Sequence, residues 1–138
     1  AFDVFKYLRD AVTDPVARRI FQLIMRDEVR HCAFGWTYMD YRVKSLTADA
    51  IKKVEVAVIV MVRDVELNGY HRAWLAPDSP ASALEVKADR LAWEAGLGGT
   101  AEELEIPIVV KTVKRVRRRM KPWGVELPAF NHPKFGVL

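Results

Sequence analysis

The sequence predicts an all-α fold. Apolar residues recur every three or four positions over several long stretches, as they do on the buried side of an amphipathic helix. Residues that start and stop helices separate these stretches. The chain has 138 residues, of which 51% are apolar and 29% charged, so it is long enough to bury the core of one modest domain.

The first predicted helix covers residues 1–12, because Phe2, Phe5 and Leu8 fall on one side of it. Neither a capping residue nor an initiator methionine precedes this helix. We therefore expect that Ala1 is not the natural beginning of the folded unit.

A second helix is predicted from Pro15 to about Arg42, since Asp14 can cap its free amides and proline suits a first turn. Thr47 is the expected N-cap of a third helix. Its centre is β-branched, but its length and flanking charges favour a helix that ends at about Leu67, before Asn68-Gly69.

The second half of the chain is predicted to hold two more helices and a tail. Prolines and glycines mark loops at residues 77–80 and 96–99, which leaves a helix over residues 81–95. Thr100 is predicted to cap the last helix, which ends before Pro122. The tail from 122 to 138 is expected to be extended and draped over the helices. We assign residues 1–76 and 77–138 to two parts of the same domain.

Composition excludes several classes of protein. No run of about 20 apolar residues is present for a membrane span, and no secretory signal opens the chain. The single cysteine, Cys32, cannot form an internal disulfide and fits a reducing compartment, so a cytoplasmic location is expected. A formal charge of +4 is too mild to indicate nucleic-acid binding by itself.

The most informative segment is the stretch 20–38, where acidic and imidazole side chains share a stripe with apolar residues. At 100° per residue, this stripe contains Ile20, Ile24, Glu28, His31, Gly35 and Tyr38. Burial of a carboxylate is costly unless something compensates its charge, and a divalent metal ion does so effectively. Glu28 and His31 are one turn apart and are therefore predicted metal ligands. The alternative is an ordinary i,i+3 pair on an exposed helix.

Neighbouring residues are given supporting roles. Asp27 is predicted to accept a hydrogen bond from the free ring N–H of a ligating imidazole. Phe21, Ile24, Gly35 and Tyr38 are candidate lining residues of a substrate pocket, although aromatic residues at this spacing are also common in plain cores.

The run Asp27-Glu28-Val29-Arg30-His31-Cys32-Ala33-Phe34-Gly35-Trp36 resembles the second Asp-Glu-x-x-His motif of ferritin-like di-iron carboxylate proteins. The branch it is most similar to includes p-aminobenzoate N-oxygenase relatives and bacterial ferritin-like domain proteins. Residues 1–15 resemble the end of that family's third bundle helix, and residues 45–64 resemble the helix after the bundle. The resemblance covers about the first half of the chain.

This resemblance implies the C-terminal half of a four-helix bundle that binds two iron ions, or manganese ions, and activates dioxygen. Only Glu28 and His31 carry over as ligands, and no catalytic residue beyond them is assigned. The resemblance leaves three possibilities for the remaining ligands. They belong to a separate segment of the same protein, they belong to a partner chain, or this chain has lost the metal centre. We expect the first of these, and a homo-oligomer.

Other candidate groups are assigned structural roles. Cys32 is read as a small buried hydrophobe. His71 and His132 are expected at the surface, and Glu66 and His71 are expected to point apart because they are five residues apart on a helix. The basic stretch 111–121 carries an apolar stripe, so it is predicted to be an amphipathic helix with a solvated basic face. It lacks interleaved aromatic residues, which disfavours nucleic acid as a partner.

Two functions follow as hypotheses. The first is a dinuclear iron or manganese oxidase or oxygenase that acts with O₂ on a small organic substrate. The second is a non-catalytic helical interaction domain of ferritin-like descent, with residues 111–121 as a basic docking helix. Iron storage is disfavoured because storage cages use compact subunits without such a long extension after the bundle.

Overall fold

The computed structural model describes residues 2–138, so Ala1, where the first helix was predicted to begin, lies outside it. The described chain is mostly helical, which confirms the all-α fold class. The long helices are α1 (Phe2–Ala11), α2 (Pro15–Arg42), α3 (Ala48–Val60), α4 (Pro80–Glu94) and α5 (Glu102–Met120). Short helical segments join them: η1 (Val43–Ser45), η2 (Met61–Val65), η3 (Glu66–Asn68), η4 (Ala73–Leu75) and η5 (Lys121–Trp123).

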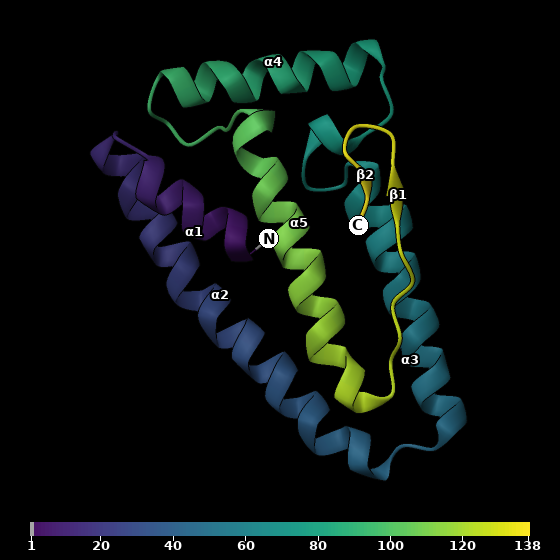
Figure 1. Ribbon diagram of the computed structural model, residues 1–138. Coiled ribbons are helices and arrows are strands. Elements are labelled where there is room, and N and C mark those ends of the chain that lie inside the picture. Colours follow the sequence, from purple (N-terminus) through teal and green to yellow (C-terminus); the bar gives the residue numbers. More distant parts are fainter. Residues whose placement is uncertain (1) are drawn as a thin grey trace.

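The helices form an open frame (Figure 1). Helix α1 lies along the first part of α2, α5 runs through the middle of the frame, and α4 crosses its upper end. The C-terminal tail passes between α5 and α3 and ends in a two-stranded antiparallel hairpin of β1 (Asn131–His132) and β2 (Gly136–Val137). None of the helices within residues 2–138 combines the length and the apolarity that a bilayer crossing requires.

Two of the three predicted caps are confirmed. The Asp14 carboxylate accepts a hydrogen bond from the Ala17 amide at 2.8 Å, and the Thr47 hydroxyl accepts one from the Ala50 amide at 3.2 Å. The prediction for Thr100 is wrong, because Ala101 occupies the N-cap position of α5 without any side-chain cap. The Thr100 side chain is buried instead of turning back to the free amides of the helix.

The glycine-rich turn between α4 and α5 contacts both the α1–α2 turn and α4. The carbonyl of Gly96 accepts hydrogen bonds from the amides of Thr13 and Asp14, in the turn between α1 and α2. At Gly99, an added Cβ would lie 1.8 Å from the carbonyl oxygen of Asp89 in α4. Only glycine permits this close approach, which holds the start of α5 against α4.

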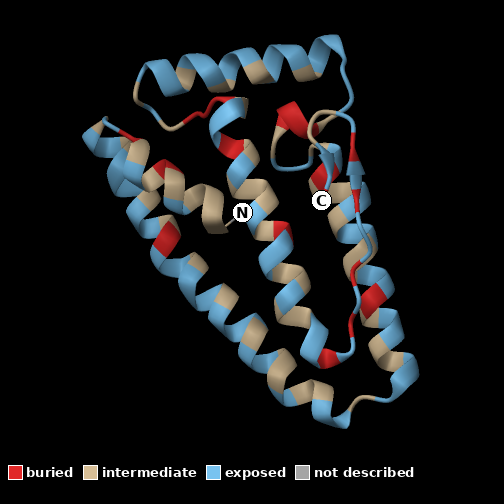
Figure 2. Ribbon diagram, in the orientation of Figure 1, coloured by how far each residue is buried: buried red, intermediate tan, exposed pale blue. Residues whose placement is uncertain are grey.

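The main core lies where the tail packs between α3 and α5, and it draws on both halves of the chain. Its buried members are Leu67, Val113, Trp123, Val125, Leu127, Phe130 and Leu138. Figure 2 shows buried stretches along the C-terminal tail, while most of the long helices are exposed or half-buried; α4 carries no buried residue and α2 only Met25.

Three arginines of the basic stretch 111–121 hold the fold together. Arg115 pairs with Asp3 of α1, and Arg117 donates hydrogen bonds to carbonyl oxygens in the tail. Arg119 pairs with Asp40 of α2. The predicted solvated basic face is therefore wrong for Arg117 and Arg119, which are half-buried against the tail and α2, whereas Arg115 is exposed as predicted although it pairs with Asp3.

Asp3 joins α1 to α5 through its carboxylate. Its oxygens accept hydrogen bonds from the Thr112 hydroxyl at 2.6 Å and from the Arg115 guanidinium at 2.8 Å. Burial alone would raise the pKa of the Asp3 carboxyl, but these two hydrogen bonds outweigh it and lower the pKa below the usual 3.8. Ionised Asp3 therefore stabilises the fold above the unfolded pKa, and this contribution is lost as the pH falls through the lower folded value.

Replacement of this carboxylate should destabilise the fold in a pH-dependent way. We expect Asp3→Asn to lower the free energy of unfolding by about 1 kcal/mol at pH 7, as measured by urea denaturation. The difference from the parent should shrink as the pH falls below about 4. Asp10→Asn is the control, since Asp10 pairs only with its neighbour Arg9 at the surface. An Asp3→Asn loss that is the same at pH 7 and at pH 3 would contradict the assignment.

Candidate functional site

Glu28 and His31 lie close together near the middle of α2. The Glu28 Oε1 and His31 Nδ1 atoms are 3.9 Å apart, as expected for residues separated by one helical turn. Their environments differ: the Glu28 side chain is 27% exposed and the His31 side chain is 77% exposed. The pair therefore sits at the border between the side of α2 that this chain covers and the side that it leaves open.

The predicted buried stripe is split between these two sides. Met25 is buried, and Cys32 and Trp36 are half-buried, on the covered side together with Glu28. His31 and Tyr38 are exposed, as is Ile20, which is 52% exposed. The prediction that this chain buries His31 is therefore wrong, because α2 carries apolar residues on two sides and the chain covers only one.

The uncovered side of α2 forms a row of exposed apolar side chains, here called the open face. Its residues recur at spacings of three and four positions, and Asp27 and His31 occupy the two middle positions of the row. The apolar members are Val16, Ile20, Leu23, Phe34, Tyr38 and Tyr41. The rings of Phe34 and Tyr38 stack with their centroids 5.9 Å apart. An exposed row of this kind, with apolar residues on both sides of a polar centre, is typical of an interface.

The predicted supporting residues have other contacts in this chain. Asp27 lies 3.4 Å from Arg26 and 3.9 Å from Arg30, so its carboxylate faces guanidinium groups and not His31. Phe21 packs against Phe5 of α1, at 6.4 Å between ring centroids, which makes it a core residue of the α1–α2 contact. Ile24 is half-buried.

Gly35 leaves an open space on α2, because a Cβ built there meets nothing within 4 Å. No element among residues 2–138 makes the close approach to Gly35 that the sequence suggested.

Cys32 is half-buried beside Glu28. Burial raises the pKa of its thiol, and the negative charges of Glu28 and Asp3 raise it further. The thiol is therefore protonated at neutral pH and is a poor metal ligand, in agreement with its reading as a small hydrophobe.

Glu28 and His31 fit one half of a dinuclear carboxylate site. One carboxylate oxygen and one imidazole nitrogen project from adjacent turns, and this donor set suits iron or manganese. Within residues 2–138, no cluster of three or more histidine, cysteine, aspartate or glutamate side chains is arranged to hold a metal ion. A metal ion bound by this pair would need further ligands from outside the described residues.

A second polar pair was missed by the sequence reasoning. Glu66 and His71 were expected to point apart, but Glu66 Oε2 and His71 Nδ1 are 2.8 Å apart. The chain does not continue as a regular α-helix here: η2 is a π-helical turn, and η3 ends at Gly69, whose φ of 96° is left-handed. Asn68-Gly69 signalled the helix end, but nothing in the periodicity signalled the wide turn before it.

The prediction that His132 lies at the surface is also wrong, because its side chain is buried. Its ring stacks on Phe135 at 4.1 Å between centroids, and its Nε2 lies 3.2 Å from the carbonyl oxygen of Leu75. Its role is to pack the C-terminal hairpin against η4.

Comparisons with protein-family models, with curated proteins and with solved structures give no match. The function is therefore inferred from the residues and their geometry.

Proposed function

We propose that α2 forms one wall of a dinuclear iron or manganese centre in an O₂-activating oxidase or oxygenase, and that α1 and α2 are half of a ferritin-like four-helix bundle. The observation that carries this proposal is the position of the Glu28/His31 pair at the border of the open face of α2, with the exposed His31 on that face and the half-buried Glu28 beside it. Two metal-binding side chains there face the place where a further helix would pack.

The surface of the chain supports the idea that other helices cover this face. The accessible area is 8843 Å², whereas a compact monomer of this mass exposes about 7,300 Å². The excess accessible area agrees with an open frame in which other parts of the described chain leave apolar helix sides uncovered. The helices that cover the open face would carry a glutamate and a second Glu-x-x-His motif, from the same polypeptide or from a partner chain.

The residues of this chain have distinct tasks in the proposed centre. Glu28 and His31 would hold one side of the metal pair, and such a pair would provide redox chemistry for the activation of O₂. Arg26 and Arg30 hold Asp27 at the surface beside the ligands. The stacked rings of Phe34 and Tyr38 provide an apolar wall. This wall would exclude water from the place where a small organic substrate and O₂ bind.

Metal analysis of the intact protein tests this proposal. We expect about two equivalents of iron or manganese per complete site. Glu28→Ala and His31→Ala should each reduce the metal content to background. Each variant removes one of the two ligands on α2, and the ligand that is left cannot hold the ion alone. Glu66→Ala and His71→Ala are matched controls, since they remove the other close glutamate–histidine pair of this chain. Full metal content in both α2 variants would defeat the assignment.

The second candidate function is a non-catalytic interaction domain, and the exposure of His31 is the observation that favours it. In that case the open face of α2 is a protein-binding surface without metal. Intact protein that takes up no iron or manganese under anaerobic loading, while its open face is protected from hydrogen exchange, would favour this alternative.

A further inference from the structure

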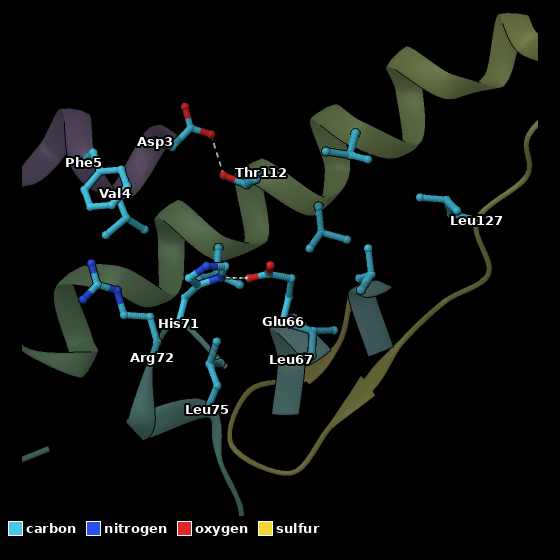
Figure 3. Close-up of a pocket in the computed structure, with 14 residues that line it drawn as sticks. Asp3, Val4, Phe5, Glu66, Leu67, His71, Arg72, Leu75, Thr112 and Leu127 are labelled. Atoms are coloured by element: carbon cyan, nitrogen blue, oxygen red, sulfur yellow. Dashed lines mark hydrogen bonds and ion pairs between the residues drawn. The ribbon is translucent and has the colours of Figure 1, made fainter. Parts of the chain in front are cut away.

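A cavity of about 340 Å³ lies between α1, α5 and the segment that follows α3. It is enclosed by the first turn of α1, the middle of α5 and the segment from η2 to η4 (Figure 3). Its volume is at the lower end of the range for small-molecule sites, about 300–1,000 Å³. Most of its wall is apolar, including Val4, Phe5, Val62, Leu75, Val109 and Val113.

The segment from η2 to Gly69 determines which polar groups reach this cavity. On a regular α-helix, residues five positions apart diverge by about 140° around the axis. The 3-10 turn η3 and the left-handed Gly69 that follows it bring Glu66 and His71 together instead, and Figure 3 shows the pair on the cavity wall, across from Val4 and Phe5. Single π-turns inside helices are frequent at functional sites because they redirect side chains.

The charges around the cavity are paired with one exception. Asp3 is matched by Arg115, and Arg72 by the buried Glu105, whose Oε1 lies 3.1 Å from the Arg72 Nε. Among residues 2–138, Glu66 has His71 as its partner, and no lysine or arginine pairs with its carboxylate. The Glu66 side chain is 37% exposed, so a bound molecule can reach it.

We propose that this cavity binds a small primary amine with an apolar body. The ammonium group pairs with the Glu66 carboxylate, and the hydrocarbon part packs among the valine and leucine side chains. His71 holds the carboxylate in position through its ring nitrogen. An ammonium group supplies the missing opposite charge, whereas a carboxylate ligand would meet Glu66 as a like charge. This site does not depend on the proposed metal centre.

Calorimetric titration at pH 7 with n-hexylamine, n-hexanol and hexanoate tests the proposal. We expect saturable binding of n-hexylamine, with hexanol at least about tenfold weaker and hexanoate weaker still. Shortening the amine should lower its affinity by about fourfold per methylene group, because each group loses contact with the apolar wall. Glu66→Gln should weaken hexylamine binding about tenfold and leave hexanol unchanged.

Two variants serve as controls. Glu94→Gln changes an exposed glutamate of α4 and should leave all affinities unchanged. Val109→Phe places a larger side chain in the cavity and should weaken amine and alcohol alike, with circular dichroism confirming that the variant is folded. Equal affinities for amine and hexanoate, an unchanged amine affinity in Glu66→Gln, or no saturable binding of hexylamine would each overturn the proposal.

Discussion

Replacement of Glu105 by alanine is expected to destabilise the fold by about 3–5 kcal/mol, because it leaves a guanidinium group without its counter-charge. The Glu105 side chain is fully buried near the start of α5, and the Arg72 side chain beside it is only 16% exposed. Glu105 Oε2 also accepts a hydrogen bond from the indole N–H of Trp74 at 2.5 Å. Removal of the carboxylate therefore leaves both a buried cation and a buried donor unsatisfied.

Urea denaturation of the variant measures this loss as a lower midpoint with an unchanged slope. Glu103→Ala is the matched control, because Glu103 lies two residues earlier on α5 and pairs with Arg90 at the surface. Its cost should stay below about 1 kcal/mol. Glu105→Gln, which keeps the shape and an acceptor oxygen, should fall between the two. Equal costs for Glu103→Ala and Glu105→Ala would show that the Arg72–Glu105 pair contributes nothing.

Trp123→Ala is expected to cost about 3–5 kcal/mol, since a buried tryptophan leaves a large cavity. Trp123 is 5% exposed and links three parts of the fold. Its ring packs on Trp36 of α2 at 5.5 Å between centroids, and the guanidinium of Arg119 lies 5.4 Å from its ring. Its indole N–H donates a hydrogen bond to Asp40 at 2.8 Å. Thermal and urea unfolding of the variant measure the loss.

Trp123→Phe separates the contributions of the ring and of the N–H group. It keeps most of the buried apolar area but removes the hydrogen bond to Asp40, so a cost of about 1–2 kcal/mol is expected. If Trp123→Ala and Trp123→Phe cost the same, the packing of the ring on Trp36 is not what stabilises this corner.

The sequence was a good guide to the helices. Asp14 and Thr47 mark helix starts through chemistry that acts within one turn, and the structure uses both as caps. The prediction for Thr100 failed because its side chain is packed in the interior and does not cap α5. No local sequence pattern records this tertiary packing.

The candidate site was harder to predict, since periodicity identifies an apolar side of a helix but not what covers it. Glu28 and His31 were placed correctly next to one another, yet only Glu28 is covered by this chain. On α2, apolar residues occupy two sides, and the choice between them depends on the elements that pack there. Similarly, the contact of Glu66 with His71 depends on how the chain turns at η3 and Gly69, which residue spacing alone does not encode.

The place of Glu66 on the cavity wall depends on the number of residues in the helix that precedes it, and the wide turn at Met61–Val65 is part of that count. A π-turn holds about one residue more than an α-turn, so loss of one residue from η2 would close it into regular α geometry, whereas loss of one residue from the regular helix α3 would rotate everything that follows by about 100°. Glu66 would then leave the cavity wall even though its identity is unchanged. In this segment, the number of residues therefore constrains the site as strongly as their chemical type.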